Sequence, residues 1–344
     1  MAVGLGTTTA RAQTRAYVTN NGSLTVSVID TATNTLVVTI PVGLDPIAVA
    51  ITPDGTRAYV ANGGTSTVSV IDTVTNTVVV SIPVGSIPIA VAITPGGTRA
   101  YVTTFENNTV SVINIATNTI VTTIPVGVSP SGVAITPDGT LAYVGNFLDN
   151  TVSVIDTATD NVVTTIPVGE RPYGVGITPD GTRVYVTNSG DNTVSVIDTA
   201  TKAMVVTIPV GLAPVAVAIT PDGTRAYVAN VEDNTVSVID TATNTVIVTI
   251  SAVGTPRGVA ITPDGTQAYV TNLHDNTVSV INTATNTVVA TIPVGLLPSG
   301  LAITPPPQAP KSKEECKNGG YLKFGPPVGP FKNQGQCVSY VEHH

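Results

Sequence analysis

The sequence predicts an all-β protein, a seven-bladed β-propeller built from four-stranded blades. The first observation behind this prediction is an internal repeat of 42 residues that runs through the chain without an insertion or deletion. One tyrosine marks each copy of the repeat: Tyr17, Tyr59, Tyr101, Tyr143, Tyr185, Tyr227 and Tyr269. A repeat with a period of 20 to 50 residues is the sequence signature of solenoids and propellers.

The second observation is that each repeat contains four short runs with strand character. In the copy that spans 173–210, these runs are 173–178, 183–188, 193–198 and 203–210. Val, Ile, Thr and Tyr dominate the runs, and segments rich in Gly, Pro, Asp and Asn separate them, as is typical of strands and turns. No 3.6-residue period is present, so almost no helix is expected. Four short strands per unit of roughly 40 residues match one propeller blade.

The third observation concerns the two ends of the repeat region. The first complete strand, 15–20, corresponds to the second strand of a blade, and the last strand, 299–304, corresponds to the first strand of a blade. The two segments would therefore complete one blade together and close the ring. In a closed ring no blade lacks a strand, so no blade exposes an unpaired strand edge where a strand is missing.

Four segments follow from the repeat and from changes in composition. Residues 1–14 form a lead-in and residues 15–304 form the propeller; residues 305–313 form a proline-rich linker, and residues 314–344 form a small cysteine-containing segment. Proline-rich linkers are extended and stiff. The final segment is too small to maintain a fold by its apolar core alone.

Charge and composition exclude several classes of function. Only 10% of the residues are charged and the net charge is −8, whereas globular proteins carry roughly 25% charged residues. An acidic chain is a poor ligand for polyanions, so nucleic acid is not an expected partner. The sequence contains no run of 18 apolar residues and is therefore not expected to span a membrane.

Cysteine and histidine are scarce. Cys316 and Cys337 both lie in the last segment, and the propeller region contains one histidine, His274. This scarcity excludes a Cys/His zinc cluster or a cysteine nucleophile within the propeller, and no cofactor or metal is predicted. A disulfide between Cys316 and Cys337 is expected, because zinc would need two more ligands; in the chain-entropy account it would contribute about 3 kcal/mol.

The repeat motif resembles that of a known family. Ala-Tyr-Val-Thr-Asn occurs at 16–20 and at 268–272, and Val-Tyr-Val-Thr-Asn occurs at 184–188. Together with Ile-Thr-Pro-Asp-Gly and Val-Ser-Val-Ile-Asp, these motifs resemble the YVTN β-propeller repeat family of bacteria and archaea. The family includes cell-surface and surface-layer proteins, and its relatives include lactonase-like and heme-linked propellers. A heme-linked role is disfavoured, because the chain lacks a Cys-x-x-Cys-His motif and its propeller has one histidine.

The last segment carries a second resemblance. Residues 314–341 are similar to a short two-cysteine segment found at the C-termini of bacterial exported proteins. The two resemblances together imply that the protein is exported, either to the extracellular space or to the bacterial cell surface. Export would also place the expected disulfide in an oxidising compartment.

Polar residues that recur in nearly every repeat are interpreted as scaffold. An aspartate precedes glycine in the turns at Asp54, Asp138, Asp180, Asp222 and Asp264, which is the composition of a tight turn. The arginines at 57, 99, 183 and 225 are expected to form surface ion pairs of little energetic weight. A functional site should instead appear where the repeat is broken.

The departures from the repeat fall on one predicted face of the ring. In propellers, the loops from the fourth strand to the next first strand share a face with the loops between the second and third strands. The first set carries Glu170, Arg171, Tyr173 and Arg257, and the second set carries Glu232 and His274, together with Phe105 and Phe147. The opposite face is expected to carry only turn chemistry.

These residues suggest a ligand site at one mouth of the central channel. Arg171 and Arg257 could hold an anion through forked hydrogen bonds, and His274 could act in acid–base chemistry with Glu170 or Glu232. An alternative interpretation is that the six candidate residues are ordinary solvated loop residues. These six are Glu170, Arg171, Tyr173, Glu232, Arg257 and His274. No catalytic residue is assigned, because no triad order, metal spacing or phosphate-binding glycine loop is present.

The sequence therefore favours a monomeric, exported or cell-surface propeller that acts in binding or structural display rather than catalysis. Its expected partners are a small anionic or carbohydrate ligand, or a component of the cell envelope such as another protein. The alternative is a lactonase- or lyase-like enzyme that uses the same channel mouth. Fold alone does not choose between the two.

Overall fold

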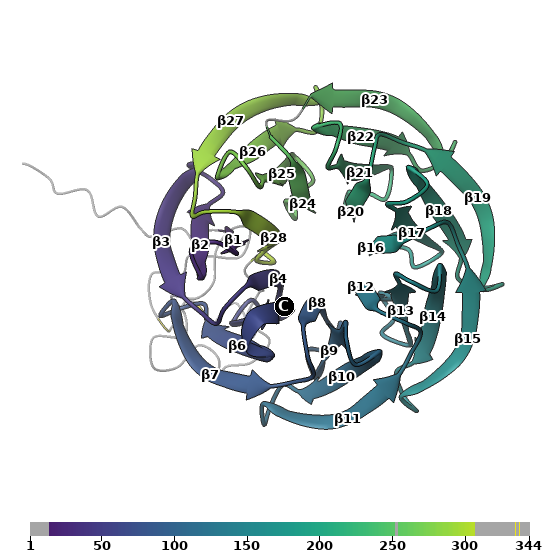
Figure 1. Cartoon of the computed structure of the whole chain (residues 1–344). Coiled ribbons are helices and arrows are strands. Elements are labelled where there is room, and N and C mark those ends of the chain that lie inside the picture. Colours follow the sequence, from purple (N-terminus) through teal and green to yellow (C-terminus); the bar gives the residue numbers. More distant parts are fainter. Residues whose placement is uncertain (1–13, 252–253, 307–333, 335–336, 338–344) are drawn as a thin grey trace, which may run out of the picture.

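The computed structural model of the chain, which describes residues 14–251, 254–306, 334 and 337, is a closed ring of seven blades around a central channel (Figure 1). Each blade is an antiparallel sheet of four strands. The predicted fold class, all-β with seven blades, is confirmed. In the described part of the chain the structure contains one 3-10 helix, η1 (Gly63–Thr65), and no helix long and apolar enough to cross a membrane.

The innermost strand of every blade begins at the periodic proline and lines the channel. Proline is tolerated as the first residue of a strand, where its missing N–H breaks no ladder. The innermost strands are β4 (Pro46–Ile51), β8 (Pro88–Ile93), β12 (Pro130–Ile135), β16 (Pro172–Ile177), β20 (Pro214–Ile219), β24 (Pro256–Ile261) and β28 (Pro298–Ile303).

The second strand of each blade carries the periodic tyrosine. The second strands are β1 (Arg15–Asn20), β5 (Arg57–Asn62), β9 (Arg99–Thr104), β13 (Leu141–Asn146), β17 (Arg183–Asn188), β21 (Arg225–Asn230) and β25 (Gln267–Asn272). The third strands are β2 (Thr25–Asp30), β6 (Thr67–Asp72), β10 (Thr109–Asn114), β14 (Thr151–Asp156), β18 (Thr193–Asp198), β22 (Thr235–Asp240) and β26 (Thr277–Asn282).

The fourth strand of each blade forms the rim of the ring. The outer strands are β3 (Thr35–Pro41), β7 (Thr77–Pro83), β11 (Thr119–Pro125), β15 (Asn161–Pro167), β19 (Ala203–Pro209), β23 (Thr245–Ser251) and β27 (Thr287–Pro293). In the copy that spans 173–210 the predicted second and third strands are correct to the residue. The first strand begins and ends one residue earlier than predicted, and the fourth ends one residue earlier.

The predicted ring closure is confirmed. β28 pairs with β1 in one antiparallel sheet whose strand order is β28-β1-β2-β3. Figure 1 shows the yellow-green end of the propeller joined to its purple beginning. The predicted strand 299–304 runs from Pro298 to Ile303, again displaced by one residue.

The core lies between the blades rather than within one sheet. One cluster joins Tyr17, Val26 and Val28 of the first blade to Val60 and Ile71 of the next, and equivalent clusters occupy the other six junctions. The periodic tyrosines are fully buried in these clusters. Since burying one aliphatic or aromatic side chain stabilises a fold by roughly 1.5–3 kcal/mol, the packing of blade on blade is the main source of stability.

Several sequence predictions fall on residues outside the described part of the chain. These are nearly all of the lead-in 1–14, most of the linker 305–313 and most of the segment 314–344, including Cys316. Cys337 is described and buried. The disulfide between Cys316 and Cys337 therefore stays a prediction.

Candidate functional site

The two loop sets that carry the candidate residues lie together, because they are hydrogen-bonded to each other in blade after blade. The amide of Phe147 donates to the carbonyl of Ser129 at 3.0 Å, and the amide of Ser189 donates to the carbonyl of Arg171 at 3.0 Å. The repeated Asp-Asn pairs add a second link. Asp191 accepts a hydrogen bond from the amide of Glu170 at 2.6 Å, and Asn150 accepts one from the amide of Arg171 at 2.9 Å. The loops therefore form one connected surface around a channel mouth.

Tyr173 and Arg257 meet at this mouth. Each is the residue directly after the first proline of an inner strand, β16 and β24, so the two lie at the same level of the ring with β20 between them. The Arg257 Nη2 atom donates to the Tyr173 hydroxyl at 3.4 Å. Both residues are half-buried. The structure therefore brings together two residues that lie 84 positions apart in the sequence.

A cavity of about 230 Å³ lies in the channel beside this pair. Its walls are formed by all seven inner strands, mostly through Val, Ala, Ile and Gly. Among the described residues, Arg257 is the one charged residue in the lining. The lining serine of β12, Ser131, already donates to the carbonyls of Pro172 and Gly145, at 2.7 Å and 3.1 Å. The lining also includes Ser299, but Tyr173 and Arg257 have the longest polar side chains in it and are therefore best placed to meet a ligand.

The inner strands approach one another closely beside Tyr173. A Cβ atom added at Gly174 would lie 2.6 Å from the carbonyl oxygen of Val215 in the neighbouring blade. Glycine is thus required for β16 to pack against β20. This close packing positions the backbone of Tyr173 at the edge of the cavity.

A row of aromatic rings supports Tyr173 from the loop side. The Phe147 ring meets the Tyr173 ring edge-on, with centroids 6.2 Å apart and an interplanar angle of 83°. The Phe105 ring in turn contacts the Phe147 ring, and the centroids of these two rings are also 6.2 Å apart. Edge-to-face pairs of this kind contribute roughly 0.5–1.5 kcal/mol beyond the area they bury. Three aromatic residues that depart from the repeat thus form one contact chain toward the channel mouth.

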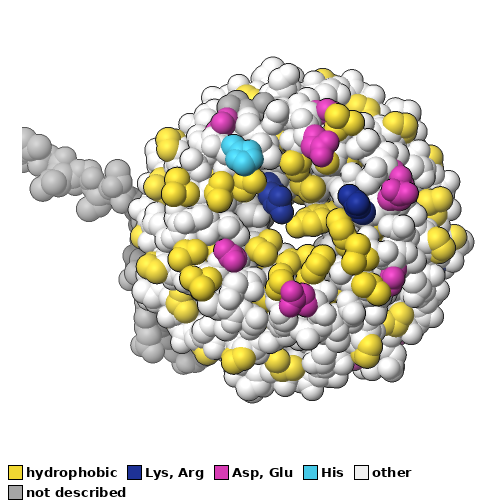
Figure 2. All heavy atoms as spheres, in the orientation of Figure 1, with side chains coloured by type: hydrophobic (Ala, Val, Ile, Leu, Met, Phe, Trp, Pro, Cys, Tyr) yellow, Lys and Arg dark blue, Asp and Glu magenta, His cyan; other side chains and the backbone are white. Residues whose placement is uncertain are grey.

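Arg171 lies on the same face but does not line the cavity. Its backbone has a φ of 54°, and it precedes Pro172, so its side chain leaves the chain before the inner strand begins. The side chain is exposed. Figure 2 shows two basic side chains beside the opening and acidic side chains at several places around it.

The remaining candidates are exposed and lie away from the cavity. Glu170, Glu232 and His274 are all solvent-exposed and are absent from its lining. Across residues 14–251 and 254–306, no hydrogen bond or ion pair joins His274 to Glu170 or Glu232. Of the six candidates, the structure therefore brings two, Tyr173 and Arg257, into direct contact. Within the described residues, no group of three or more His, Cys, Asp or Glu side chains is arranged to hold a metal.

The opposite face carries the repeated turns, as predicted, together with ion pairs. Asp138 accepts hydrogen bonds from the Thr136 hydroxyl at 2.5 Å and from the Thr140 amide at 3.0 Å, and the Thr136 bond is the largest cause of the lowered pKa of its carboxyl group. The predicted ion pairs form at three arginines, as Arg57–Asp72, Arg99–Asp160 and Arg183–Asp198. Arg225 differs, since its Nη1 atom donates to the carbonyl of Thr283 at 2.6 Å.

Comparisons with known proteins agree with a β-propeller repeat protein. The choice-of-anchor I domain family matches residues 148–301, and the lactonase 7-bladed β-propeller family matches residues 48–208. Each match covers less than half of the chain. No curated protein matches the sequence.

Two solved structures illustrate the likeness of fold. A functionally unknown protein from Desulfotomaculum acetoxidans DSM 771 has a TM-score of 0.77 at 21% identity, covering 85% of this chain and 99% of its own. The Kuenenia stuttgartiensis hydrazine synthase has a TM-score of 0.68 at 27% identity, covering 74% of this chain and 88% of that chain. The chain therefore belongs to the broad class of propeller repeat proteins.

Proposed function

We propose that this propeller is a binding module that recognises a small anionic ligand at the channel mouth formed by Tyr173 and Arg257. The observation that carries the proposal is the contact between Arg257 Nη2 and the Tyr173 hydroxyl at 3.4 Å, above an apolar channel with one charged lining residue. Arginine presents a planar fork of donors that matches carboxylate and phosphate groups. The tyrosine hydroxyl supplies one more donor beside it.

The channel supports a ligand that has an apolar part as well as an anionic head. Apart from the polar pair and two serines, Ser131 and Ser299, the lining consists of Val, Ala, Ile, Gly and Leu from the inner strands. Ligand sites of this kind combine an apolar wall with a few convergent polar groups. We therefore expect a carboxylate that carries a short alkyl chain to bind more tightly than acetate or inorganic phosphate.

Isothermal titration calorimetry with hexanoate, acetate, phosphate and neutral hexanamide tests the proposal. We expect hexanoate to bind best and hexanamide to bind at least tenfold more weakly. Arg257→Ala should lose binding, while Arg171→Ala, which removes an exposed arginine of the same face, should lose much less. Equal binding of hexanoate to wild type and Arg257→Ala, or no saturable binding by any anion, would contradict the proposal.

Hydrolysis of a lactone at the same mouth is the second candidate, because the lactonase family matches residues 48–208. The geometry supports lactone hydrolysis less well than it supports anion binding. The cavity lining contains neither a carboxylate nor a histidine, and Glu170, Glu232 and His274 are exposed away from it. A panel of lactones assayed by proton release separates the two candidates: turnover that is lost in Arg257→Ala would replace the binding module with an enzyme.

We propose further that the protein is exported and acts at the bacterial cell surface. The match to the choice-of-anchor I domain family at 148–301 and the resemblance to YVTN repeats support this location. Protease treatment of intact cells of the native host, followed by immunoblotting, tests surface exposure. Mass spectrometry of the exported chain before and after reduction tests the disulfide between Cys316 and Cys337. Two free thiols in exported material would contradict that disulfide.

A further inference from the structure

The periodic tyrosines connect neighbouring blades through their hydroxyl groups. In six of the seven copies the hydroxyl donates to an asparagine or aspartate in the next blade; the Tyr227 hydroxyl, for example, donates to Asn286 Oδ1 at 2.7 Å. The other five pairs are Tyr17–Asn76, Tyr59–Asn118, Tyr101–Asp160, Tyr185–Asn244 and Tyr269–Asn34. This bond is therefore a regular part of the blade junction.

One junction departs from the pattern at two positions. Tyr143 is fully buried, and its hydroxyl has no hydrogen-bond partner among the residues that the structure describes, because Lys202 occupies the position of the partner asparagine. Two residues before the tyrosine, Leu141 stands where every other copy has arginine or glutamine. Both departures fall between the blade of β12–β15 and the blade of β16–β19. The face expected to carry only turn chemistry therefore has a local break in its symmetry.

The equivalent junctions show what the arginine does. Arg225 Nη1 donates to the carbonyl of Thr283 at 2.6 Å, and the Tyr227 hydroxyl reaches the same carbonyl at 3.4 Å. Arg99 Nη1 likewise donates to the carbonyl of Thr157 at 3.2 Å. The guanidinium group, the tyrosine hydroxyl and a threonine carbonyl thus meet at one point between two blades. Leu141, Tyr143 and Thr199 are the corresponding residues of the altered junction.

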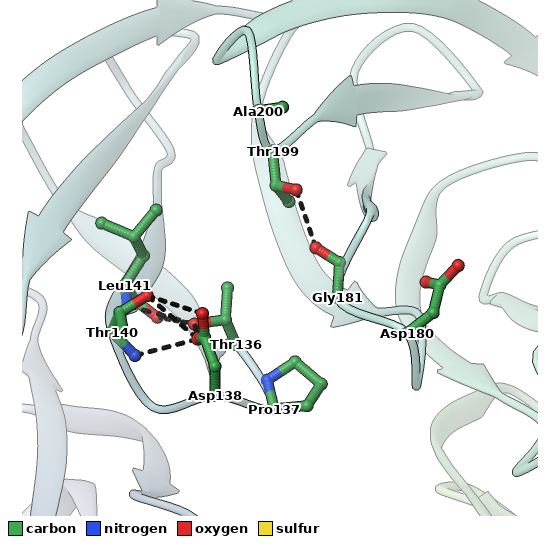
Figure 3. A pocket seen from close by; sticks show the side chains of 9 residues that line it. All are labelled: Thr136, Pro137, Asp138, Thr140, Leu141, Asp180, Gly181, Thr199 and Ala200. Carbon is green, nitrogen blue, oxygen red and sulfur yellow. Dashed lines mark hydrogen bonds between the residues drawn. The ribbon is translucent and has the colours of Figure 1, made fainter.

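A pocket of about 200 Å³ lies at the altered junction (Figure 3). Its walls include Leu141 and Asp138 from one blade and Thr199 from the next. Figure 3 shows Leu141 and Asp138 on one side of the pocket, with Thr199 across it. The Thr199 side chain donates to the carbonyl of Gly181 at 2.7 Å. The wall thus combines an apolar leucine with oxygen acceptors from both blades.

The charge around this pocket favours a cation. Asp138 and Asp180 line it, and Asp156 lies opposite Leu141 in the β13–β14 ladder. At the same ladder position in two other blades, Asp72 and Asp198 pair with an arginine of their own blade. Burial, with smaller effects of Asp198 and Asp138, raises the pKa of Tyr143 to about 12, so its hydroxyl stays protonated at neutral pH.

Lys202 is the positively charged residue that departs from the repeat at this junction. It is half-buried, and within the described ranges 14–251 and 254–306 it forms no ion pair with Asp138, Asp156 or Asp180. It is also absent from the lining of the pocket. Because its ammonium group is not paired with these carboxylates, it can compete for them with a cation that enters the pocket. The experiment below therefore includes a variant that removes Lys202.

We propose that this junction binds a guanidinium group from outside the chain, which enters the pocket and donates to the Thr199 carbonyl. Tyr143 is not part of the pocket lining, and its hydroxyl lies on the buried side of the site. The group would occupy the place that an arginine side chain occupies in the neighbouring junctions, with Asp138 and Asp156 supplying the compensating charge. A free small guanidine and an arginine side chain of a partner protein share this chemistry. The site lies on the face opposite the channel mouth and is independent of the proposed anion site.

Titration of the isotope-labelled full chain with agmatine, followed by amide NMR, tests this proposal. We expect saturable shifts confined to Thr140, Gly181, Thr199 and their neighbours. Urea, which is similar in shape but neutral, should cause no saturable shift there. An acetylated and amidated Gly-Arg-Gly peptide distinguishes the two sources, since it should bind more tightly than agmatine only if the site recognises an arginine within a polypeptide.

Two variants make the test decisive. Leu141→Arg combined with Lys202→Asn restores the residues of the other junctions, so it should fold, raise the Tm and abolish the agmatine shifts. Lys202→Asn alone removes a competing positive charge and should tighten agmatine binding severalfold relative to wild type. Shifts that persist in the double variant would overturn the proposal. So would binding seen only in Lys202→Asn, since Lys202 would then be the natural occupant.

Discussion

Tyr17 lies opposite Ala302 in the ladder that joins β1 to β28, so the two ends of the propeller share one sheet. The blade they complete packs its tyrosine and valines against the next blade. Loss of β28 would therefore expose an edge of β1 and remove packing from two junctions at once.

Deletion of residues 299–304 should destabilise the whole ring rather than a single blade. We expect the thermal unfolding midpoint to fall by more than 10 °C, or the chain to become insoluble, because a change of several kcal/mol shifts the midpoint by roughly 2–4 °C per kcal/mol in a domain of 150–250 residues. Calorimetry measures this. A chain that ends at residue 306 keeps β28 and is the matched control. An unchanged midpoint in the deletion variant would show that β28 contributes little.

Gly96→Asp should stabilise the protein by about 0.5–1.5 kcal/mol, the usual net value of a hydrogen bond. Gly96 occupies the turn position that aspartate occupies in five other blades, and a Cβ atom added there meets nothing within 4 Å. The new carboxylate should accept hydrogen bonds from Thr94 and Thr98, as Asp222 does from Thr220 and Thr224. Urea unfolding measures the change, and Asp222→Gly should produce a loss of similar size.

The buried tyrosines predict a loss of stability in alkaline solution. Burial raises the pKa of Tyr17, Tyr59 and Tyr185 to about 12, as it does for Tyr143, and it raises the pKa of Tyr101, Tyr227 and Tyr269 as well. The unfolded chain ionises its tyrosines near pH 10. The stabilising effect is thus complete below pH 10 and is lost progressively as the pH rises toward 12.

Denaturant unfolding at pH 7, 8 and 11 checks this sign, with the free energy of unfolding expected to be equal at the first two values and lower at the third. Absorbance near 295 nm should show that the periodic tyrosines ionise together with unfolding. Their ionisation near pH 10 in a chain that stays folded would contradict the prediction.

Phe147→Ala should weaken ligand binding at the channel mouth, although Phe147 does not line the cavity. The edge-on contact with Tyr173 would be lost, and a pair of this kind contributes roughly 0.5–1.5 kcal/mol, which corresponds to about twofold to twelvefold in Kd. Phe105→Ala, which removes a ring that contacts Phe147 but not Tyr173, should have a smaller effect. Calorimetric titration with hexanoate compares the two variants; equal losses would show that the contact does not position Tyr173.

The fold could be predicted from the sequence because every blade has the same pattern of strand and turn residues, with no insertion or deletion between repeats. Boundaries were displaced by one residue at β16 because Pro172 already pairs with Asn188, although it lacks an N–H. The site was only partly predictable. Tyr173 and Arg257 hold the same position after proline and meet, whereas Arg171 lies before that proline and stays outside the cavity. Leu141 and Lys202 depart from the repeat on the opposite face, and their effect could not be predicted because it depends on a hydrogen bond between blades, from tyrosine to asparagine, that the sequence does not show.

The pairing of β28 with β1 has a consequence for the order of events during synthesis. The six blades built from consecutive strands, β4 to β27, can each be completed soon after their own residues leave the ribosome. The seventh cannot, since β1, β2 and β3 are the first strands of the ring to emerge and must wait for β28, residues 298–303, which is the last strand of the ring to emerge. Domains generally fold as their residues are synthesised, from the N-terminus onward. In this chain the earliest strands are therefore the ones that spend the longest time without their partner, and a chaperone that shields nascent strands would act first on residues 15–41.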